Sequence, residues 1–256
     1  MGHFTAVFML ARQIQKCSQE ILFKARMGED LQDQLDWLAQ LEFKPFVASF
    51  RRDEERLAFW INLYNGLTVH HLRNKPETLS KSTSRRLHFN EKKICIAGKD
   101  LSFNMIEHGI LRRSKVWWSL GYLGDPFSSR TVKALQVDRL DPRLHFALNC
   151  GGLSCPPIRH YDPEGIHEQL DLAASAFIEG GSEVSVEGDV VHISRLFQWY
   201  QGDFGGPEGI RSWIASYMPV PSGKWKIRYQ AYDWTLGLPE VPPREDTGSQ
   251  GMSSNA

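Results

Sequence analysis

Residues 57–69 read Leu57-Ala-Phe-Trp-Ile-Asn-Leu-Tyr-Asn-Gly-Leu-Thr-Val69, and the expected fold is built around them. It lies inside a predicted helix from Glu54 to about Asn74, which Asp53 would cap and Pro76 would end. The side chains are apolar nearly all round, and a helix of that kind is normally buried on most sides. We therefore expect it to be the central element of the molecule.

The segments around this helix predict a mixture of helices and short strands. An opening helix from Phe4 to Arg26 and a leucine-spaced second helix precede it, and a polar, locally basic loop over residues 76–93 follows it. The other expected helices cover residues 103–113, 164–178, 194–200 and 207–217, with strands at 94–96, 144–149, 184–186, 190–193 and 225–229. An ordered surface loop is expected over residues 117–127. The pattern predicts a single α+β domain with a small, mostly antiparallel sheet.

The composition excludes several classes of protein. The 256 residues include 30 Lys and Arg against 30 Asp and Glu, so the formal net charge is zero and a nucleic-acid partner is not expected. No segment reaches the roughly 18 to 20 apolar residues of a membrane span, and the apolar residues 4–11 lack the flanks of a secretory signal. Four cysteines do not form a disulfide scaffold, so we expect a reducing, cytoplasmic location.

The strongest chemical motif is His145-Phe-Ala-Leu-Asn-Cys-Gly-Gly-Leu-Ser-Cys-Pro-Pro157. Alternation along the expected strand places His145 and Asn149 on a polar face, and Cys150 on the apolar one. Cys155 precedes two prolines, which commonly begin a helical turn, and a helix N-terminus lowers the pKa of a thiol. A histidine beside such a thiol is the arrangement of a cysteine nucleophile. Structural packing of both cysteines, or a disulfide between them, also fits the motif.

Two further predicted helices carry polar residues among apolar ones. On the helix over residues 103–113, Glu107 projects into the apolar arc, where it would orient a histidine or form a structural salt bridge, whereas Arg112 lies on the other side. On the central helix, Asn62 and Asn65 share a face with Gly66, so backbone should pack closely there. Pinning of the loop from Asn149 to Cys155 is the expected role of these amides.

The motifs together resemble the domain of unknown function 547 family. The segments that carry the resemblance are residues 59–65, 106–112, 145–157, 197–204 and 232–234. It spans roughly Asp53 to Leu238, which implies a helical extension over residues 1–52, a family domain over 53–238 and a disordered tail over 239–256. The family pattern implies functional roles for Glu107, Arg112, His145, Cys150 and Cys155. It implies no established reaction, although some eukaryotic members also carry glutaredoxin and DEP domains.

These residues lead to one principal hypothesis, an intracellular cysteine-dependent hydrolase or acyltransferase of papain-like or transglutaminase-like character. Cys155 or Cys150 would be the nucleophile, His145 the base and Glu107 the orienting carboxylate. A protein or peptide substrate would be bound by the residues Arg112, Asn65, Asn62 and Asn149. The chain order Glu, His, Cys differs from the Cys, His order of papain.

Two hypotheses from other classes stay open beside it. One is a non-catalytic interaction module whose polar residues pin a buried loop. The other is a redox protein that uses Cys150 and Cys155 as a couple. No cofactor is expected, and no metal, because His145 and the two cysteines supply at most three of the four ligands of a closed zinc site.

Overall fold

The computed structural model of the chain describes residues 2–180, 183–222 and 225–241. Its helices are α1 (Gly2–Met27), α2 (Gln32–Gln40), α3 (Phe43–Ser49), α4 (Asp53–Asn74), α5 (Ser82–Asn90), α6 (Arg130–Leu135), α7 (Ile166–Glu179), α8 (Arg195–Trp199) and α9 (Gly206–Tyr217). Short helical turns are η1 (Pro76–Leu79), the π-helix η2 (Met105–Leu111), η3 (Pro142–Phe146) and η4 (Pro163–Gly165). The strands are β1 (Ile94–Ile96), β2 (Lys99–Leu101), β3 (Val184–Glu187), β4 (Val190–Ile193) and β5 (Lys226–Tyr229). The predicted single α+β domain is confirmed.

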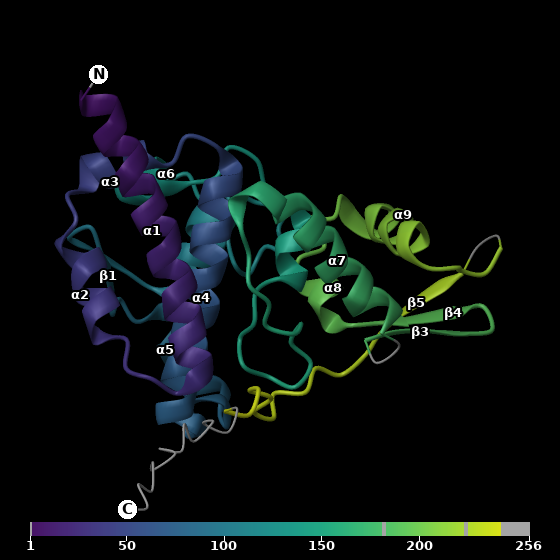
Figure 1. Cartoon of the computed structure of the whole chain (residues 1–256). Helices are drawn as coiled ribbons and strands as arrows, with labels where there is room; N and C mark the ends of the chain where they lie inside the picture. The colour runs from purple at the N-terminus through teal and green to yellow at the C-terminus, as the bar shows by residue number, and fades with distance from the viewer. Residues whose placement is uncertain (1, 181–182, 223–224, 242–256) are drawn as a thin grey trace, which may run out of the picture.

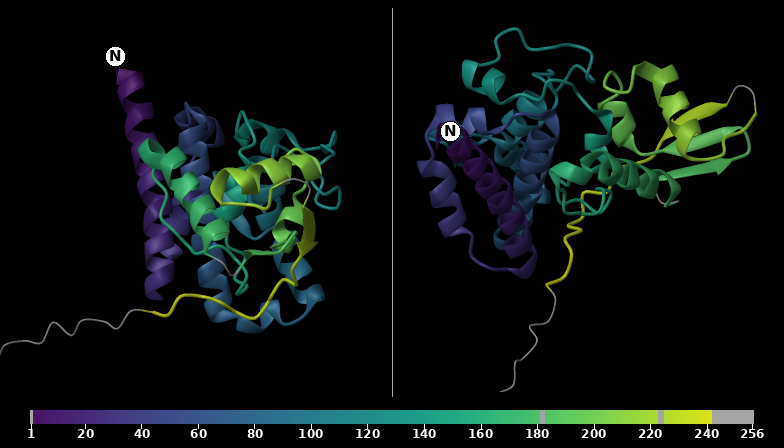
Figure 2. Two further views of the ribbon diagram at one scale, coloured as in Figure 1. Left: turned by 90° about the vertical axis from the view of Figure 1, so that its right-hand side faces the viewer. Right: turned by 45° about the horizontal axis from the view of Figure 1, so that its top comes forward.

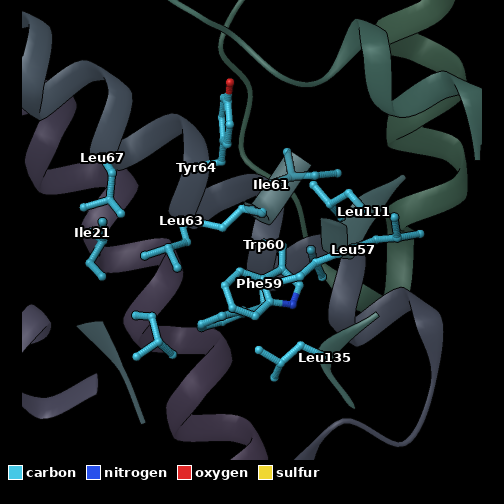
Figure 3. Close-up of a cluster of buried hydrophobic side chains, with 14 of the residues drawn as sticks. Ile21, Leu57, Phe59, Trp60, Ile61, Leu63, Tyr64, Leu67, Leu111 and Leu135 are labelled. Atoms are coloured by element: carbon cyan, nitrogen blue, oxygen red, sulfur yellow. The ribbon is translucent and has the colours of Figure 1, made fainter. Parts of the chain in front are cut away.

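Helix α4 is the central element that its sequence predicts. Nearly all of its middle is buried, and its apolar side chains form the main core with residues of α1, η2 and α6 (Figure 3). Helix α1 lies along α4 (Figure 1). The close approach depends on Gly66, since a Cβ there would lie 2.9 Å from Cγ2 of Ile21 and 3.0 Å from the backbone of Leu22.

The strands form two small sheets. Strands β1 and β2 make an antiparallel pair, while β3 and β4 make the predicted hairpin, to which β5 adds in parallel. The second sheet, α7, α8 and α9 enclose a second hydrophobic core, on the side of the molecule away from α1 (Figure 1). Phe146 is buried in this second core although its neighbours Leu144 and Ala147 belong to the first. The segment that contains His145 therefore joins the two cores.

Two expectations near α4 are wrong. Asp53 is the first residue of the helix, not its cap, and its carboxylate accepts the backbone N–H groups of Asp138 and Arg139 at 2.6 and 2.9 Å. The expected polar loop over residues 76–93 contains η1 and α5, because Leu79 and His88 turn into the molecule and anchor them.

The expected strand over residues 144–149 is also wrong. Asp141 caps the turn η3 by accepting the N–H of Arg143 at 3.0 Å, and Pro142 stands at its first position, where proline favours a helical turn. Leu144, His145 and Phe146 are all buried, so no polar and apolar faces alternate there.

The predicted helix over residues 103–113 is wound differently from an α-helix. Ser102 caps it by accepting the N–H of Met105 at 3.1 Å, but over η2 the bonds run from residue i+5, such as Arg112 N–H to the Glu107 carbonyl at 2.8 Å. This wider winding brings Glu107 and Arg112 both into the interior, where an α-helix would have placed them apart.

Of the expected tail over residues 239–256, residues 242–256 lie outside the described residues.

Candidate functional site

Cys150 and Cys155 lie side by side beneath Tyr232. Their Sγ atoms are 2.8 Å apart, closer than ordinary van der Waals contact and farther than a disulfide bond of about 2.05 Å. The Tyr232 hydroxyl lies 3.0 Å from Cys155 Sγ and 3.4 Å from Cys150 Sγ. The backbone N–H of Cys150 also donates to Cys155 Sγ at 3.2 Å. Both cysteines are free and only partly exposed.

The hydrogen bonds favour a thiolate on Cys155 and a thiol on Cys150. Burial alone would raise the pKa of Cys155, but the donors of Cys150 and Tyr232 stabilise its charged form and leave the pKa below the usual range of a thiol. The bond that Cys150 gives to Cys155, together with burial, holds the pKa of Cys150 well above that range. One thiol is thus activated, and its neighbour keeps its proton.

The loop that carries the two cysteines is pinned to α4. The side-chain amide of Asn65 donates to the carbonyl of Ala147 at 2.8 Å and accepts the N–H of Asn149 at 2.9 Å. Asn149 in turn donates to the carbonyl of Pro156 and accepts the N–H of Gly151, both at 2.7 Å, which closes the loop on itself. Pinning of this loop is what the sequence predicts for Asn65.

Asn62 pins a different segment in the same way. It donates to the carbonyl of Tyr161 at 2.7 Å and accepts the N–H of that residue at 3.0 Å. The side-chain amides expected to bind substrate therefore form hydrogen bonds with backbone groups, namely those of Asn62, Asn65 and Asn149. These bonds favour a structural role over substrate binding.

Residues 231–238 form a strap across the outside of the cysteine loop. Backbone bonds join Leu153 to Thr235 at 2.8 Å and Gly237 to Gly151 at 2.9 Å, and the Ser154 hydroxyl accepts the N–H of Asp233 at 3.1 Å. Tyr232 packs between Trp199 and Trp234, with ring centroids 4.9 and 4.8 Å away. The strap thereby fixes the hydroxyl that contacts both sulfurs.

A second cluster of functional candidates is a buried network of charges around Asp203. Its carboxylate Oδ2 accepts from Arg112 Nε at 2.6 Å and from His145 Nε2 at 2.8 Å. Arg112 is fully buried, and its Nη1 also donates to Nδ1 of His108 at 2.7 Å. Burial would raise the pKa of Asp203, but its two partners outweigh burial and lower the pKa, so Asp203 is the anion that balances Arg112.

Glu107 belongs to the same network but contacts tyrosines. Its carboxylate accepts from the hydroxyls of Tyr64 at 3.1 Å and Tyr200 at 2.6 Å. Burial raises the pKa of both hydroxyls well above the usual range, and the charge of Glu107 raises it further, so both remain donors.

Three expected site contacts are absent from the described part of the chain. His145 is not within hydrogen-bond distance of either sulfur, because its Nε2 is bonded to Asp203 and its ring stacks on Tyr200 at 3.8 Å. Among the described residues, Glu107 forms no hydrogen bond or ion pair with His145, and its Oε1 lies instead 3.5 Å from Nδ1 of His108, as in the structural salt bridge expected as the alternative. Arg112 contacts Asp203 and His108, and it is sealed from any substrate carboxylate.

The expected reason for an activated Cys155 is wrong as well. The residues after Cys155 run without helical turns as far as η4, so no helix dipole reaches the sulfur. Hydrogen bonds from Cys150 and Tyr232 take the place of the expected helix N-terminus.

The expected set lacks five residues of this site, namely Tyr64, His108, Tyr200, Asp203 and Tyr232. The last three stand in the aromatic segments 197–204 and 232–234, which the sequence marks as unusual and which suggest only core packing. The sequence gives one local indication that Asp203 is functional, which is its position inside an aromatic segment. A carboxylate among buried aromatic rings needs a cationic partner.

Neither metal binding nor membrane spanning has support in the described residues. Over the described ranges, no three His, Cys, Asp or Glu side chains are grouped so as to hold a metal ion. Likewise, no helix described is long and apolar enough to cross a membrane.

Comparison with known proteins identifies a family and no activity. No curated protein and no solved structure matches the chain. Residues 48–178, just over half of the 256 residues, match the family described as "Protein of unknown function, DUF547". The match includes α4, η2 and the cysteine loop, and so it contains both the network and the sulfur pair except for the contributions of residues 200–203 and 232. The chain therefore belongs to the DUF547 family.

Proposed function

We propose that this protein is a thiol–disulfide oxidoreductase in which Cys155 is the nucleophile and Cys150 the resolving thiol. The observation that carries the proposal is the set of donors around Cys155 Sγ, from Cys150 Sγ at 2.8 Å, Tyr232 Oη at 3.0 Å and Cys150 N–H at 3.2 Å. A low-pKa thiolate in contact with a second, protonated thiol is the arrangement that disulfide exchange requires.

The reaction consumes a substrate disulfide and yields two thiols. The Cys155 thiolate attacks one substrate sulfur, so that a mixed disulfide forms and the other substrate sulfur leaves as a thiolate that takes up a proton. Cys150 then loses its proton and attacks Cys155 Sγ, which breaks the mixed disulfide and releases the second substrate thiol. The two protein thiols are oxidised to one disulfide, and the substrate disulfide is reduced. A reducing compartment such as the cytoplasm would return the pair to its dithiol state.

A cysteine hydrolase or acyltransferase is the second candidate, favoured by the same thiolate. It also needs an acid to protonate the leaving group, and His145, the residue expected for this task, is hydrogen-bonded to Asp203 instead of a sulfur. The residues present around Cys155 therefore favour exchange between sulfurs over acyl transfer.

The test measures the reactivity of each cysteine. We expect a limiting alkylating agent to modify Cys155 at a lower pH than Cys95. Cys95 is exposed, and its pKa is raised by slight burial and by the neighbouring Asp100. With oxidised glutathione, the wild type should form a Cys150–Cys155 disulfide. The Cys150→Ser variant should accumulate a mixed disulfide on Cys155, and Cys95→Ser, the matched control, should behave as the wild type.

Each other outcome rejects the proposal. Slow alkylation of Cys155 at every pH would favour the non-catalytic interaction module. A stable acyl group transferred from an activated ester to Cys155, without formation of a Cys150–Cys155 disulfide, would favour the hydrolase or acyltransferase.

A further inference from the structure

The loop between η2 and α6 plays no part in the cysteine site, yet it presents large apolar side chains to solvent. Trp117 and Trp118 are 64% and 62% exposed, and Phe127 is 91% exposed. The complete set of exposed apolar residues in the loop is Trp117, Trp118, Leu120, Tyr122, Leu123 and Phe127. The loop lies at the edge of the molecule, drawn in teal at the top of the right-hand view (Figure 2). Apolar side chains concentrated in this way mark an interaction surface.

The exposure is built into the loop by its own hydrogen bonds. The N–H of Val116 donates to the carbonyl of Leu123 at 2.9 Å, and Ser119 Oγ donates to the carbonyl of Val116 at 2.8 Å while it accepts the N–H of Leu123 at 3.1 Å. Leu120 has a φ of 53°, which a leucine adopts only under constraint. The outward positions of the rings therefore belong to an ordered conformation.

The loop is also fastened to the body of the protein. The N–H of Gly202 donates to the carbonyl of Leu120 at 2.7 Å. A Cβ on Gly121 would lie 2.5 Å from Oδ1 of Asp203, so the loop backbone rests directly on that buried carboxylate. The middle of the loop is thus held against the body of the protein while its aromatic side chains remain exposed.

Basic residues flank this apolar segment on both sides in the sequence. Arg113, Arg130 and Lys133 are exposed and Lys115 is partly exposed. Asp125 is the only acidic residue between positions 113 and 133, and its carboxylate accepts the N–H of Phe127 at 2.9 Å. In a chain whose formal net charge is zero, this segment has an excess of three positive charges.

We propose that residues 114–129 bind the surface of an anionic lipid bilayer, with their tryptophan and tyrosine side chains in the interface and the basic residues against the headgroups. Tryptophan and tyrosine are enriched at this depth, because their rings have both apolar and polar parts. Lysine and arginine are attracted to anionic headgroups. Side chains that project singly from a loop suit a fluid bilayer, whereas a protein partner requires a matching pocket for each. The protein would bind the bilayer peripherally and would not span it.

Vesicle binding tests the proposal with the full chain. We expect it to sediment with vesicles of phosphatidylcholine and phosphatidylglycerol, with a blue shift of tryptophan fluorescence, and to bind pure phosphatidylcholine much more weakly. The Trp117→Ser/Trp118→Ser variant should lose on the order of tenfold in partition coefficient, since binding scales with the apolar area inserted. Leu87→Ser is the matched control, because Leu87 is 73% exposed on the separate helix α5 and should not contribute.

The proposal fails if the wild type binds neither kind of vesicle, or if Leu87→Ser weakens binding as much as the tryptophan variant does. It also fails if the variant, shown to be folded by circular dichroism, binds as tightly as the wild type. A complex with a second protein that needs Trp117 and Trp118, in a chain that ignores vesicles, would replace the bilayer with a protein partner.

Discussion

Cys155 illustrates how one side chain acquires reactivity from its immediate neighbours. A partly buried sulfur would ordinarily keep its proton, since a charge is poorly solvated there. Donors from Cys150 and Tyr232 reverse that preference. The Tyr232 hydroxyl is the donor that can be removed without changing either cysteine, so its effect on the pKa of Cys155 can be measured with one substitution.

We expect Tyr232→Phe to raise the pKa of Cys155, because it removes one of the donors that stabilise the thiolate. The pH profile of alkylation at Cys155 should move to higher pH while the fold is kept. Tyr161→Phe is the control, since the hydroxyl of Tyr161 is buried with no hydrogen-bond partner in the described structure. An unchanged profile in Tyr232→Phe would show that Tyr232 does not stabilise the thiolate.

Asp203 is the second residue whose environment predicts a large effect. Asp203→Asn keeps the shape of the side chain but leaves Arg112 as a buried charge without its anion. We expect a loss of about 3–5 kcal/mol in the free energy of unfolding, measured with urea. As the control, Asp171→Asn removes a salt bridge between Arg143 and the Asp171 carboxylate, which is 59% exposed. This variant should lose less than about 1 kcal/mol in the free energy of unfolding. Equal losses in both variants would contradict this account of the network.

At the scale of elements, the site depends on two departures from regular packing. The π-helix η2 turns Glu107 and Arg112 into the same interior, and Gly66 lets α1 approach α4 closely enough for their backbones to meet. Because α4 also carries Asn65, which pins the cysteine loop, the seating of α1 on α4 supports the helix on which the site is built.

Gly66→Ala should therefore destabilise the protein by about 1–3 kcal/mol, as overpacking of a core does. The added Cβ would lie only 3.0 Å from the backbone of Leu22, which cannot move without the whole of α1. Gly124→Ala is the control, since the nearest atom to its Cβ would be 3.9 Å away. Thermal unfolding compares the two, and a Gly66→Ala variant as stable as the control would mean that α1 shifts without cost.

For the whole molecule, the free energy of unfolding should depend on pH, because several buried or partly buried histidines are held in their neutral form in the folded state. His71 and His88 stack with ring centroids 4.0 Å apart. Burial, followed by the charge of Lys93, lowers the pKa of His71 to about 4, and burial, followed by the charge of His71, lowers that of His88 to about 3. His145 is shifted in the same direction, mainly by burial.

Stability should consequently fall as the pH drops from 6.5 toward 4. In this window the unfolded chain binds protons on histidines whose ordinary pKa is 6.5, and the folded chain does not. Thermal unfolding across this range would measure the slope. His88→Phe, which keeps an aromatic ring beside Phe89 and Phe103, should flatten it, whereas His160→Phe at an exposed position should not. Equal slopes in all three proteins would exclude this origin of the pH dependence.

Elements whose signals are local can be predicted from the amino-acid sequence alone. The apolar residues of α4, the β3–β4 hairpin and the pinning role of Asn65 follow from spacing and side-chain chemistry, as does the suspicion attached to Cys150 and Cys155. These properties depend on neighbours a few residues away, or on the plain requirement that a buried amide be satisfied.

Contacts between groups that lie far apart in the sequence depend instead on how the whole chain packs. Asp203 reaches His145 across 58 positions, and Tyr232 reaches Cys155 across 77. Periodicity carries no information on such pairings. The second hydrophobic core brings α8 against η3, and backbone hydrogen bonds hold the strap against the cysteine loop. Hydrogen bonds formed in that packing, and not a helix dipole or a histidine base, set the charge of the sulfur.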